Sequence, residues 1–233
     1  MYKEAIHNYL TSRGYNSINL KAVLFDMDGV LFNSMPSHAK SWHRVMKKFG
    51  YNLSEQEAYM HEGRTGSSTI NIVSNRERGH DATQEEIETI YKAKTVEFNS
   101  FPKSERMPGA LEVLTQISSQ GLIPMVVTGS GQKSLLDRLN KNFPDIFKEE
   151  LMVTAYDVKH GKPHPEPYLM ALEKAGIKAN EAVVIENAPL GVQAGVAAGI
   201  FTIAVNTGPL DDSILIDEGA NLLFPSMNSF AES

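Results

Sequence analysis

The pattern that most constrains the fold is a series of short apolar segments, each followed by small or polar residues and then by a helical stretch. Several of these segments are rich in Val and Ile without polar alternation, which is typical of strands buried on both faces of a parallel sheet. Helical stretches at about 110–119, 133–142, 167–175 and 190–198 separate them. Alternating strands and helices predict a doubly wound, Rossmann-like α/β core with a parallel sheet. The expected strands are residues 22–25, 123–127, 151–153, 182–185, 201–205 and 221–224.

One interval interrupts this alternation. Residues 26–122 are too long for a single crossover and have a helical pattern. Within them, residues 35–49 carry apolar residues at helical spacing, and residues 83–98 begin with the cap-like sequence Thr-Gln-Glu-Glu. We therefore predict a small helical cap domain at residues 33–103, inserted between core segments 21–32 and 104–233. Residues 33–34 and 101–104 would be its linkers, and residues 1–20 an N-terminal extension, helical or frayed.

Composition excludes several classes of protein. The 233 residues carry 22 Lys+Arg and 28 Asp+Glu, a formal net charge of −6, which disfavours nucleic acid as a partner. There is no cysteine, so disulfides, thiol catalysis and Cys-ligated metals are excluded. No apolar run approaches the roughly 18 residues that span a bilayer, and charged residues interrupt the first twenty positions, unlike a signal peptide. We expect a cytoplasmic protein without a membrane partner, and take a monomer as the default.

Chemically capable residues follow the predicted strands at the point where each strand ends. In an open α/β sheet ligands bind at the carboxyl ends of the strands, so these residues should meet at one edge. A lysine-proline pair after the third segment should reach the same edge. The residues are Asp26 and Asp28 after the first strand, Thr128, Gly129 and Ser130 after the second, Lys162 after the third, and Glu186 and Asn187 after the fourth.

This combination predicts phosphoryl transfer. Carboxylates that leave a buried strand are costly unless a cation offsets them, and Mg²⁺ is the hard ion that oxygen ligands favour. Asp26 could attack phosphorus to form an aspartyl-phosphate, and Asp28 could serve as general acid and then base. Thr128 and Lys162 would hold the transferring oxygens by hydrogen bond and by charge.

These motifs resemble the four signature motifs of the haloacid dehalogenase superfamily of phosphotransferases. The stretches GKPHPEPYLMAL and VVIENAPLGVQAGVAAG are similar to its β-phosphoglucomutase-like branch, which carries a helical cap just after the first motif. The resemblance runs from Lys21 to about Phe224. It implies that Asp26 is the nucleophile, Asp28 the general acid/base, and Thr128 and Lys162 the phosphoryl binders. Mg²⁺ would sit on the Asp26 carboxylate, the Asp28 carbonyl and the loop of Glu186 and Asn187.

Two departures from the family pattern stand out. Relatives usually have Asp where this chain has Asn187, so the site loses a negative charge. In the cap loop at residues 61–66, mutase-like members have Lys before the glycine and Arg three residues after it, where this chain has Glu62 and Gly66. We hypothesise that Glu62 swings in with the closing cap and supplies the acidic metal contact that Asn187 does not provide. That would favour a small, highly charged substrate such as inorganic pyrophosphate over a hexose phosphate.

The predicted function is Mg²⁺-dependent hydrolysis of a small phosphate compound, either a phosphate monoester or pyrophosphate. The alternative is β-phosphoglucomutase, and a remote one is a non-catalytic sensor of a phosphorylated metabolite. Expected substrate-binding residues are Glu62, Arg64, Thr65, Gly129, Ser130 and His38. Lys92 and Lys94 face opposite parts of one predicted cap helix, and either could reach the substrate, but we favour a solvated surface for each. We take His160 and His164 to be loop residues.

Overall fold

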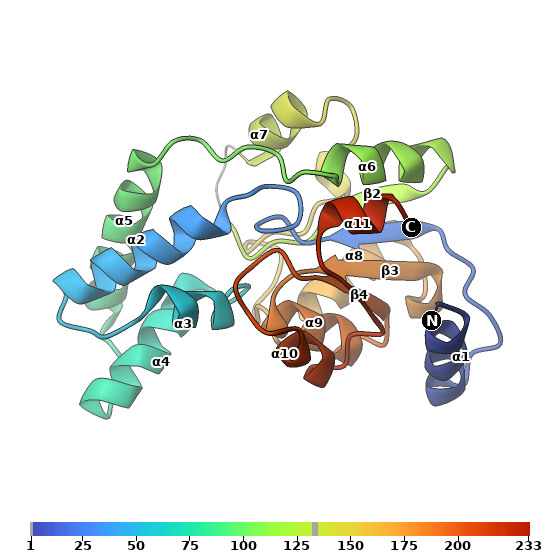
Figure 1. Ribbon diagram of the computed structural model, residues 1–233. Coiled ribbons are helices and arrows are strands. Elements are labelled where there is room, and N and C mark those ends of the chain that lie inside the picture. The colour runs from blue at the N-terminus through green and yellow to red at the C-terminus, as the bar shows by residue number, and fades with distance from the viewer. Residues whose placement is uncertain (1, 132–134) are drawn as a thin grey trace.

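A five-stranded parallel sheet forms the centre of the molecule (Figure 1). The computed structural model describes residues 2–131 and 135–233, except for the side chain of residue 135. The strand order is β2-β1-β3-β4-β5, so the chain starts inside the sheet and builds outward in both directions. The pairing is in register, with Phe25 opposite both Val126 and Ile185. The strands are β1 (Ala22–Phe25), β2 (Ile123–Val126), β3 (Ala182–Glu186), β4 (Phe201–Val205) and β5 (Leu222–Phe224).

Helices cover both faces of this sheet, which confirms the doubly wound α/β prediction. One face packs against α6 (Ala110–Ser119), α7 (Leu135–Asn142) and α11 (Met227–Ala231). The other packs against α8 (Glu166–Ala175) and α9 (Pro189–Ala197), with α10 (Asp212–Asp217) beyond. The helix predicted at 133–142 begins in residues outside the described ones. Because strands β1, β3 and β4 are sandwiched, each of their residues is buried, as their largely apolar sequences indicate.

The strand predicted at residues 151–153 is wrong. Its place is taken by a short 3₁₀ turn, Glu149–Leu151, and a single parallel bridge between Val127 and Val153. The segment is three residues long and lies beyond the edge strand β2, so it has one neighbour to pair with. Met152 and Val153 are nevertheless buried, so the apolar pattern correctly indicated burial.

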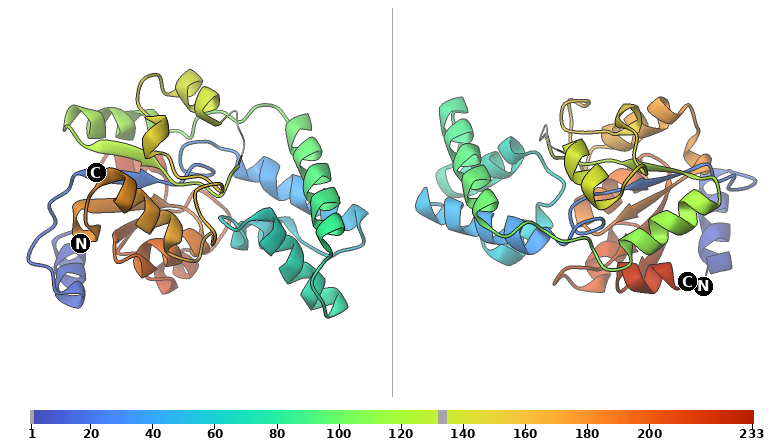
Figure 2. Two further views of the ribbon diagram at one scale, coloured as in Figure 1. Left: turned by 180° about the vertical axis from the view of Figure 1, so that it is seen from behind. Right: turned by 90° about the horizontal axis from the view of Figure 1, so that it is seen from above.

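Between β1 and α6 the chain forms four consecutive helices that lie to one side of the sheet (Figure 2). They are α2 (Met35–Lys48), α3 (Glu55–Met60), α4 (Gly66–Arg78) and α5 (Gln84–Ser100). They enclose a hydrophobic core of their own, separate from the cores on the two faces of the sheet. We call these helices the cap. The bounds at residues 33 and 103 stay a prediction.

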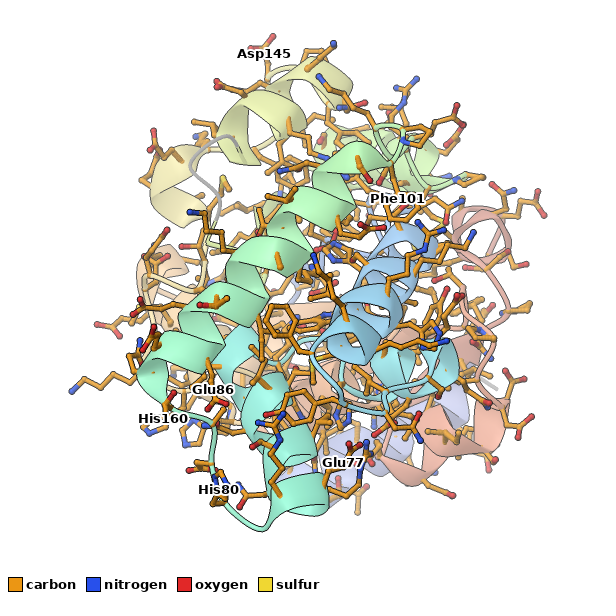
Figure 3. All side chains as sticks on the ribbon, turned by 90° about the vertical axis from the view of Figure 1, so that its left-hand side faces the viewer. Glu77, His80, Glu86, Phe101, Asp145 and His160 are labelled. Carbon is orange, nitrogen blue, oxygen red and sulfur yellow. The ribbon has the colours of Figure 1, made fainter. Side chains whose placement is uncertain are left out.

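Local sequence determines where the long cap helix α5 begins. The Thr83 hydroxyl accepts from the Glu86 backbone N–H, and the Glu86 carboxylate accepts from the Thr83 N–H, a reciprocal capping box. Figure 3, which looks onto the cap, shows Glu86 near this end and Phe101 where the helix ends, beside the linker to α6.

Residues 1–20 include a docked helix rather than a frayed segment. Helix α1 (Tyr2–Arg13) buries Tyr9, whose hydroxyl donates to the Gly199 carbonyl at 2.9 Å, and Arg13 donates to the Val196 carbonyl at 2.6 Å. No helix in the described ranges 2–131 and 135–233 is long and apolar enough to cross a membrane.

Candidate active site

The residues predicted at the strand ends do converge. Lys162 is buried and its ammonium group donates to Asp26 Oδ1 at 2.5 Å, to Glu186 Oε1 at 2.6 Å and to the Val127 carbonyl at 3.0 Å. Three segments far apart in sequence are thereby joined at the carboxyl edge of the sheet. Burial alone would lower the pKa of Lys162, but the adjacent carboxylates of Asp26 and Glu186 raise it above its usual range, so the lysine is cationic.

Glu186 is a structural anchor for that lysine. Its Oε1 also accepts from the Tyr168 hydroxyl at 2.7 Å, and its Oε2 accepts from the backbone N–H groups of Asn187 and Ala188. Gly191 leaves room for this carboxylate, because a Cβ there would lie 1.8 Å from Glu186 Oε1. Both oxygens of Glu186 are therefore already occupied by protein donors. Tyr168 was not predicted as a site residue, because its place in the apolar pattern of 167–175 resembles that of a core residue.

Asp28 is held from the cap side. The Ser34 hydroxyl donates to Asp28 Oδ1 at 2.5 Å, and His38 Nε2 lies 3.5 Å from the same oxygen. Burial alone would raise the pKa of Asp28, but the adjacent His38 and the hydrogen bond from Ser34 lower it below the usual range. Asp28 is thus a carboxylate at neutral pH.

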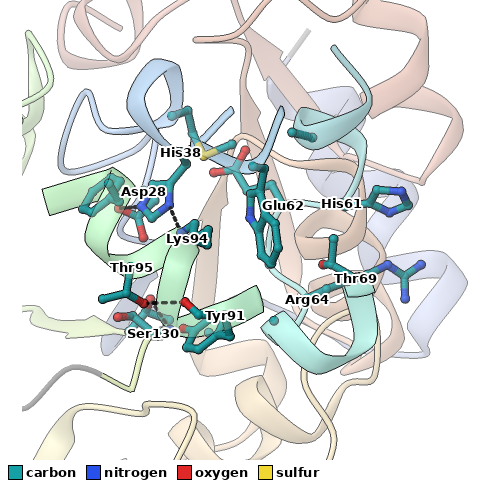
Figure 4. Close-up of a pocket in the computed structure, with 18 of the residues that line it drawn as sticks. Asp28, His38, His61, Glu62, Arg64, Thr69, Tyr91, Lys94, Thr95 and Ser130 are labelled. Carbon is teal, nitrogen blue, oxygen red and sulfur yellow. Dashed lines mark hydrogen bonds and ion pairs between the residues drawn. The ribbon is translucent and has the colours of Figure 1, made fainter. Parts of the chain in front are cut away.

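Lys94 is not on the solvated surface, contrary to our expectation. It is 7% exposed, and its Nζ lies 2.7 Å from His38 Nδ1, so His38 sits between Lys94 and Asp28 (Figure 4). Burial lowers the pKa of Lys94 to about 8 and also lowers the pKa of His38. A neutral His38 that accepts from Lys94 at Nδ1 carries its proton on Nε2, facing Asp28. The sequence spacing could have predicted the burial of Lys94, because it lies four residues from both Ile90 and Phe98, on the inward face of α5.

The cap loop between α3 and α4 lies directly on the core. The Asn187 amide donates to both oxygens of Glu62, at 3.1 and 3.2 Å. A Cβ at Gly63 would lie 3.0 Å from Lys162 Cδ, and one at Gly129 would lie 3.1 Å from the Gly63 carbonyl. This is a closed arrangement, and it brings Glu62 to Asn187 as our hypothesis requires. Its contact with a metal stays a prediction.

The site contains more acidic than basic side chains, so a bound cation would fit it. Burial, together with the charges of Asp26 and Glu186, raises the pKa of Glu62 well above its usual range, and burial raises the pKa of Asp26 to about 7 despite the neighbouring Lys162. Asn187 turns its Nδ2 toward Glu62, which leaves its buried Oδ1 without a hydrogen-bond partner among the described residues. An oxygen with no partner beside unneutralised carboxyls is a fitting ligand set for a hard divalent ion.

A cavity of about 100 Å³ lies between cap and core. Several of the residues predicted from the sequence line it, namely Asp26, Asp28, His38, Glu62, Arg64, Thr128, Gly129 and Ser130. Figure 4 shows the side chains of Arg64 and His61 pointing away from Asp28 and Lys94, so Arg64 borders the cavity without turning its guanidinium toward Asp28. Thr65 lies outside the lining set and caps α4, accepting from the Ser68 N–H.

Comparison with known proteins decides the family. The model of the haloacid dehalogenase-like hydrolases matches residues 23–205, most of the chain. The chain belongs to the haloacid dehalogenase-like hydrolases. It is 31% identical to hexitol phosphatase A of Escherichia coli over 80% of this chain and 83% of that protein. It is 30% identical to a phosphorylated carbohydrates phosphatase of Thermotoga maritima, over 86% of this chain and 92% of that protein.

A solved structure of a Bacteroides vulgatus protein, provisionally assigned as a β-phosphoglucomutase, has 75% sequence identity to this chain. The TM-score is 0.97, with 99% of this chain and 94% of that chain covered. The chain is therefore an enzyme of the phosphatase and phosphomutase group within the haloacid dehalogenase-like hydrolases. The resemblance read from the motifs is confirmed, including the β-phosphoglucomutase-like branch.

Proposed function

We propose that this haloacid dehalogenase-like enzyme is a Mg²⁺-dependent phosphohydrolase that works through an aspartyl-phosphate on Asp26. The substrate would be a small phosphate compound, either a phosphate monoester or inorganic pyrophosphate. The observation that carries the proposal is the Glu62–Asn187 contact, which brings an acidic cap residue to the loop after β3, beside a cavity of about 100 Å³.

Asp26 and Asp28 divide the chemistry between them. An oxygen of Asp26 attacks the substrate phosphorus, and the bond to the leaving oxygen breaks. Asp28, a carboxylate in the free enzyme, would take up a proton as the anionic substrate binds beside it and give that proton to the leaving oxygen. Asp28 then takes a proton from a water molecule that attacks the phosphorus, so inorganic phosphate leaves and Asp26 is restored. The Ser34 hydroxyl and His38 keep the Asp28 carboxylate in place for both steps.

Other residues hold the transferring group. Lys162, which is cationic and contacts Asp26, would offset charge on the phosphoryl oxygens, and the buried Thr128 would donate its hydroxyl to one of them. Lys94 lines the same cavity from the cap and would offset charge on the leaving part of an anionic substrate. The closed cap loop excludes bulk water from these contacts.

Mg²⁺ would be held by Asp26, Asp28 and Asn187, with Glu186 orienting the loop and Glu62 supplying further negative charge. The unpartnered Oδ1 of Asn187 and the acidic excess support this assignment. When bound, the ion would offset charge on the phosphoryl group and on the attacking carboxylate.

The test compares hydrolysis with isomerisation on purified protein in Mg²⁺. Phosphate release from pyrophosphate and from a panel of small esters is set against conversion of β-glucose 1-phosphate to glucose 6-phosphate. We expect phosphate release to have the higher kcat/KM, and Asp26→Asn to lower it by at least about 10³-fold while circular dichroism stays unchanged.

Two results would contradict the proposal. Dominant isomerisation would make the enzyme a β-phosphoglucomutase, as the relative from Bacteroides vulgatus is provisionally assigned. Binding of phosphate compounds without any product would make it a sensor.

A further inference from the structure

Two histidines and a glutamate gather where a loop of the core enters α8. The three residues are His160, His164 and Glu166, here called the His–Glu cluster, and one ligating atom of each lies within 4.8 Å of the others. Glu166 Oε2 is 2.7 Å from His160 Nδ1 and 3.8 Å from His164 Nδ1, and the two imidazole ring centroids are 4.8 Å apart. Two imidazoles and a carboxylate therefore face one small volume.

The backbone of this loop holds the carboxylate of the cluster in place. Glu166 Oε1 accepts from the Lys159 N–H at 2.7 Å, and its Oε2 accepts from the His160 N–H at 3.0 Å. At the end of the loop, the Glu166 N–H donates to His164 Nδ1 at 3.2 Å. A ring nitrogen that accepts a hydrogen bond carries no proton, so the lone pair of His164 Nδ1 is on the side that faces Glu166. The ligands are thus arranged before any ion binds.

An ion can reach the cluster directly from solvent. The side chains of His160 and His164 are 65% and 52% exposed, and that of Glu166 is 23% exposed. Figure 3 shows His160 at the outer edge of the molecule. Three protein ligands would leave the remaining coordination positions of an ion to water, as in open zinc sites.

The donor set of the cluster differs from that of the proposed Mg²⁺ site. There the ligands would all be oxygens, which suit a hard ion. Imidazole nitrogen suits Zn²⁺, Cu²⁺ and Ni²⁺, so two imidazoles and one carboxylate favour a transition-metal ion over Mg²⁺. The proton that His160 Nδ1 donates to Glu166 would move through solvent to Nε2 of the same ring, which leaves Nδ1 free to bind the ion without net release of a proton.

The loop that carries the cluster also carries the lysine of the active site. Lys162 lies between the two histidines in sequence, is 3% exposed and contacts Asp26. The same loop touches the cap, because a Cβ at Gly161 would lie 3.3 Å from Thr65 Cγ2. An ion on the cluster would connect the two ends of this loop and would stabilise the position of Lys162.

We propose that the His–Glu cluster is a binding site for a divalent transition-metal ion, Zn²⁺ above all, and that its occupancy stabilises the loop of Lys162. The site is separate from the proposed Mg²⁺ site. It does not depend on the proposed function either, because none of its three ligands lines the cavity between cap and core.

Equilibrium dialysis of the untagged protein against Zn²⁺, in a large excess of Mg²⁺ that fills oxygen-ligand sites, tests the proposal. We expect one Zn²⁺ per chain in the wild type and a rise in Tm when it binds. His160→Gln and His164→Gln should each raise the Kd for Zn²⁺ at least about tenfold and remove most of the rise in Tm. His80→Gln, which removes an exposed imidazole from the cap, is the matched control and should change neither quantity.

Three results would overturn the proposal. The wild type could bind no Zn²⁺ in excess Mg²⁺, in which case the cluster is not a metal site. Both cluster variants, folded by circular dichroism, could bind Zn²⁺ as tightly as the wild type, which would place the ion elsewhere, for example on the strand-end carboxylates. Finally, His80→Gln could weaken binding as much as the cluster variants, which would mean that the effect belongs to exposed histidines in general.

Discussion

At the scale of single residues, the candidate active site contains more acidic than basic side chains. The charge of Lys162 offsets those of Asp26 and Glu186, and Lys94 lies against His38. The partly buried Glu62 lies beside the neutral amide of Asn187. A carboxylate withdrawn from water beside a neutral amide lowers the stability of the fold, and a bound divalent cation would offset that loss.

Glu62→Gln tests whether the cap acid contributes to metal binding. Loss of one negative charge near the ion should raise the Mg²⁺ concentration for half-maximal phosphate release about tenfold, and EDTA should abolish release in both proteins. Glu55→Gln, on the exposed side of α3, is the matched control. An unchanged Mg²⁺ requirement in Glu62→Gln would show that Asn187 does not need this partner.

In the protein without substrate, the buried charge of Lys94 should lower the free energy of unfolding. Its pKa is lowered to about 8 by burial, so below pH 8 the folded state carries the full cost of a buried charge, and this cost disappears as pH rises from about 8 toward the value of an unfolded lysine. Lys94→Met should therefore raise the free energy of unfolding by about 3 kcal/mol at pH 7 and by less at pH 9.5.

Urea denaturation at the two pH values measures the effect of Lys94→Met. Lys92→Met, two residues away and exposed, should change neither value. Phosphate release should fall in Lys94→Met, because the cavity loses a cation. A variant that is less stable than the wild type at pH 7 would mean that the Lys94–His38 contact outweighs the cost of burial.

At the scale of elements, the loop between α3 and α4 couples the cap to the core. Gly63 has φ +86°, a conformation that favours glycine, and its Cα hydrogens face the Lys162 side chain. The closed position of Glu62 therefore depends on a backbone that approaches Lys162 closely.

Gly63→Ala should impair closure. The added Cβ would lie 3.0 Å from Lys162 Cδ, so the loop must withdraw, and we expect kcat/KM to fall about 10–100-fold. Gly79→Ala is the matched control, because Gly79 has φ +77° at the end of α4, but a Cβ there would meet no atom within 4 Å. Both variants should lose about 1 kcal/mol of stability in thermal unfolding. Equal activity of the two would show that contact with Lys162 does not matter.

At the scale of the whole molecule, the site and the N-terminal helix lie at opposite ends of the sheet. Helix α1 docks beside the start of β4, where the Tyr9 ring meets Phe201 edge-on at 5.3 Å, while Asp26 and Glu186 leave the other ends of the strands (Figure 1). Substitutions in α1 should therefore change the stability of the protein without changing its catalytic activity.

Variants at Tyr9 test that separation. Tyr9→Ala removes a buried aromatic ring and should cost about 3 kcal/mol of unfolding free energy. Tyr9→Phe removes the hydrogen bond to Gly199 and should cost about 1 kcal/mol. Neither should change kcat/KM under conditions where the protein is folded. A fall in activity with Tyr9→Phe, measured well below its Tm, would show that α1 communicates with the site.

Local patterns predicted the parts of this protein that depend on local physics. Residues 22–25, 182–185 and 201–205 are strands because short, largely apolar segments are buried on both faces of a parallel sheet. Thr83 begins a helix because its capping box closes within four residues. The strand predicted at residues 151–153 was wrong, because strand pairing depends on a neighbouring strand that the segment's own sequence does not specify.

The sequence by itself determined the α/β core, the inserted helices and the convergence of Asp26, Thr128 and Glu186, because parallel strands bring their carboxyl ends to one edge whatever the side chains are. Lys162 reaches the same edge from a loop, without a strand of its own before it. Only the tertiary structure decided which cap residues face that edge. Whether Lys94 points inward and whether Glu62 reaches Asn187 depend on how the cap packs against the core. That packing comes from contacts between residues far apart in the chain, which no periodicity records.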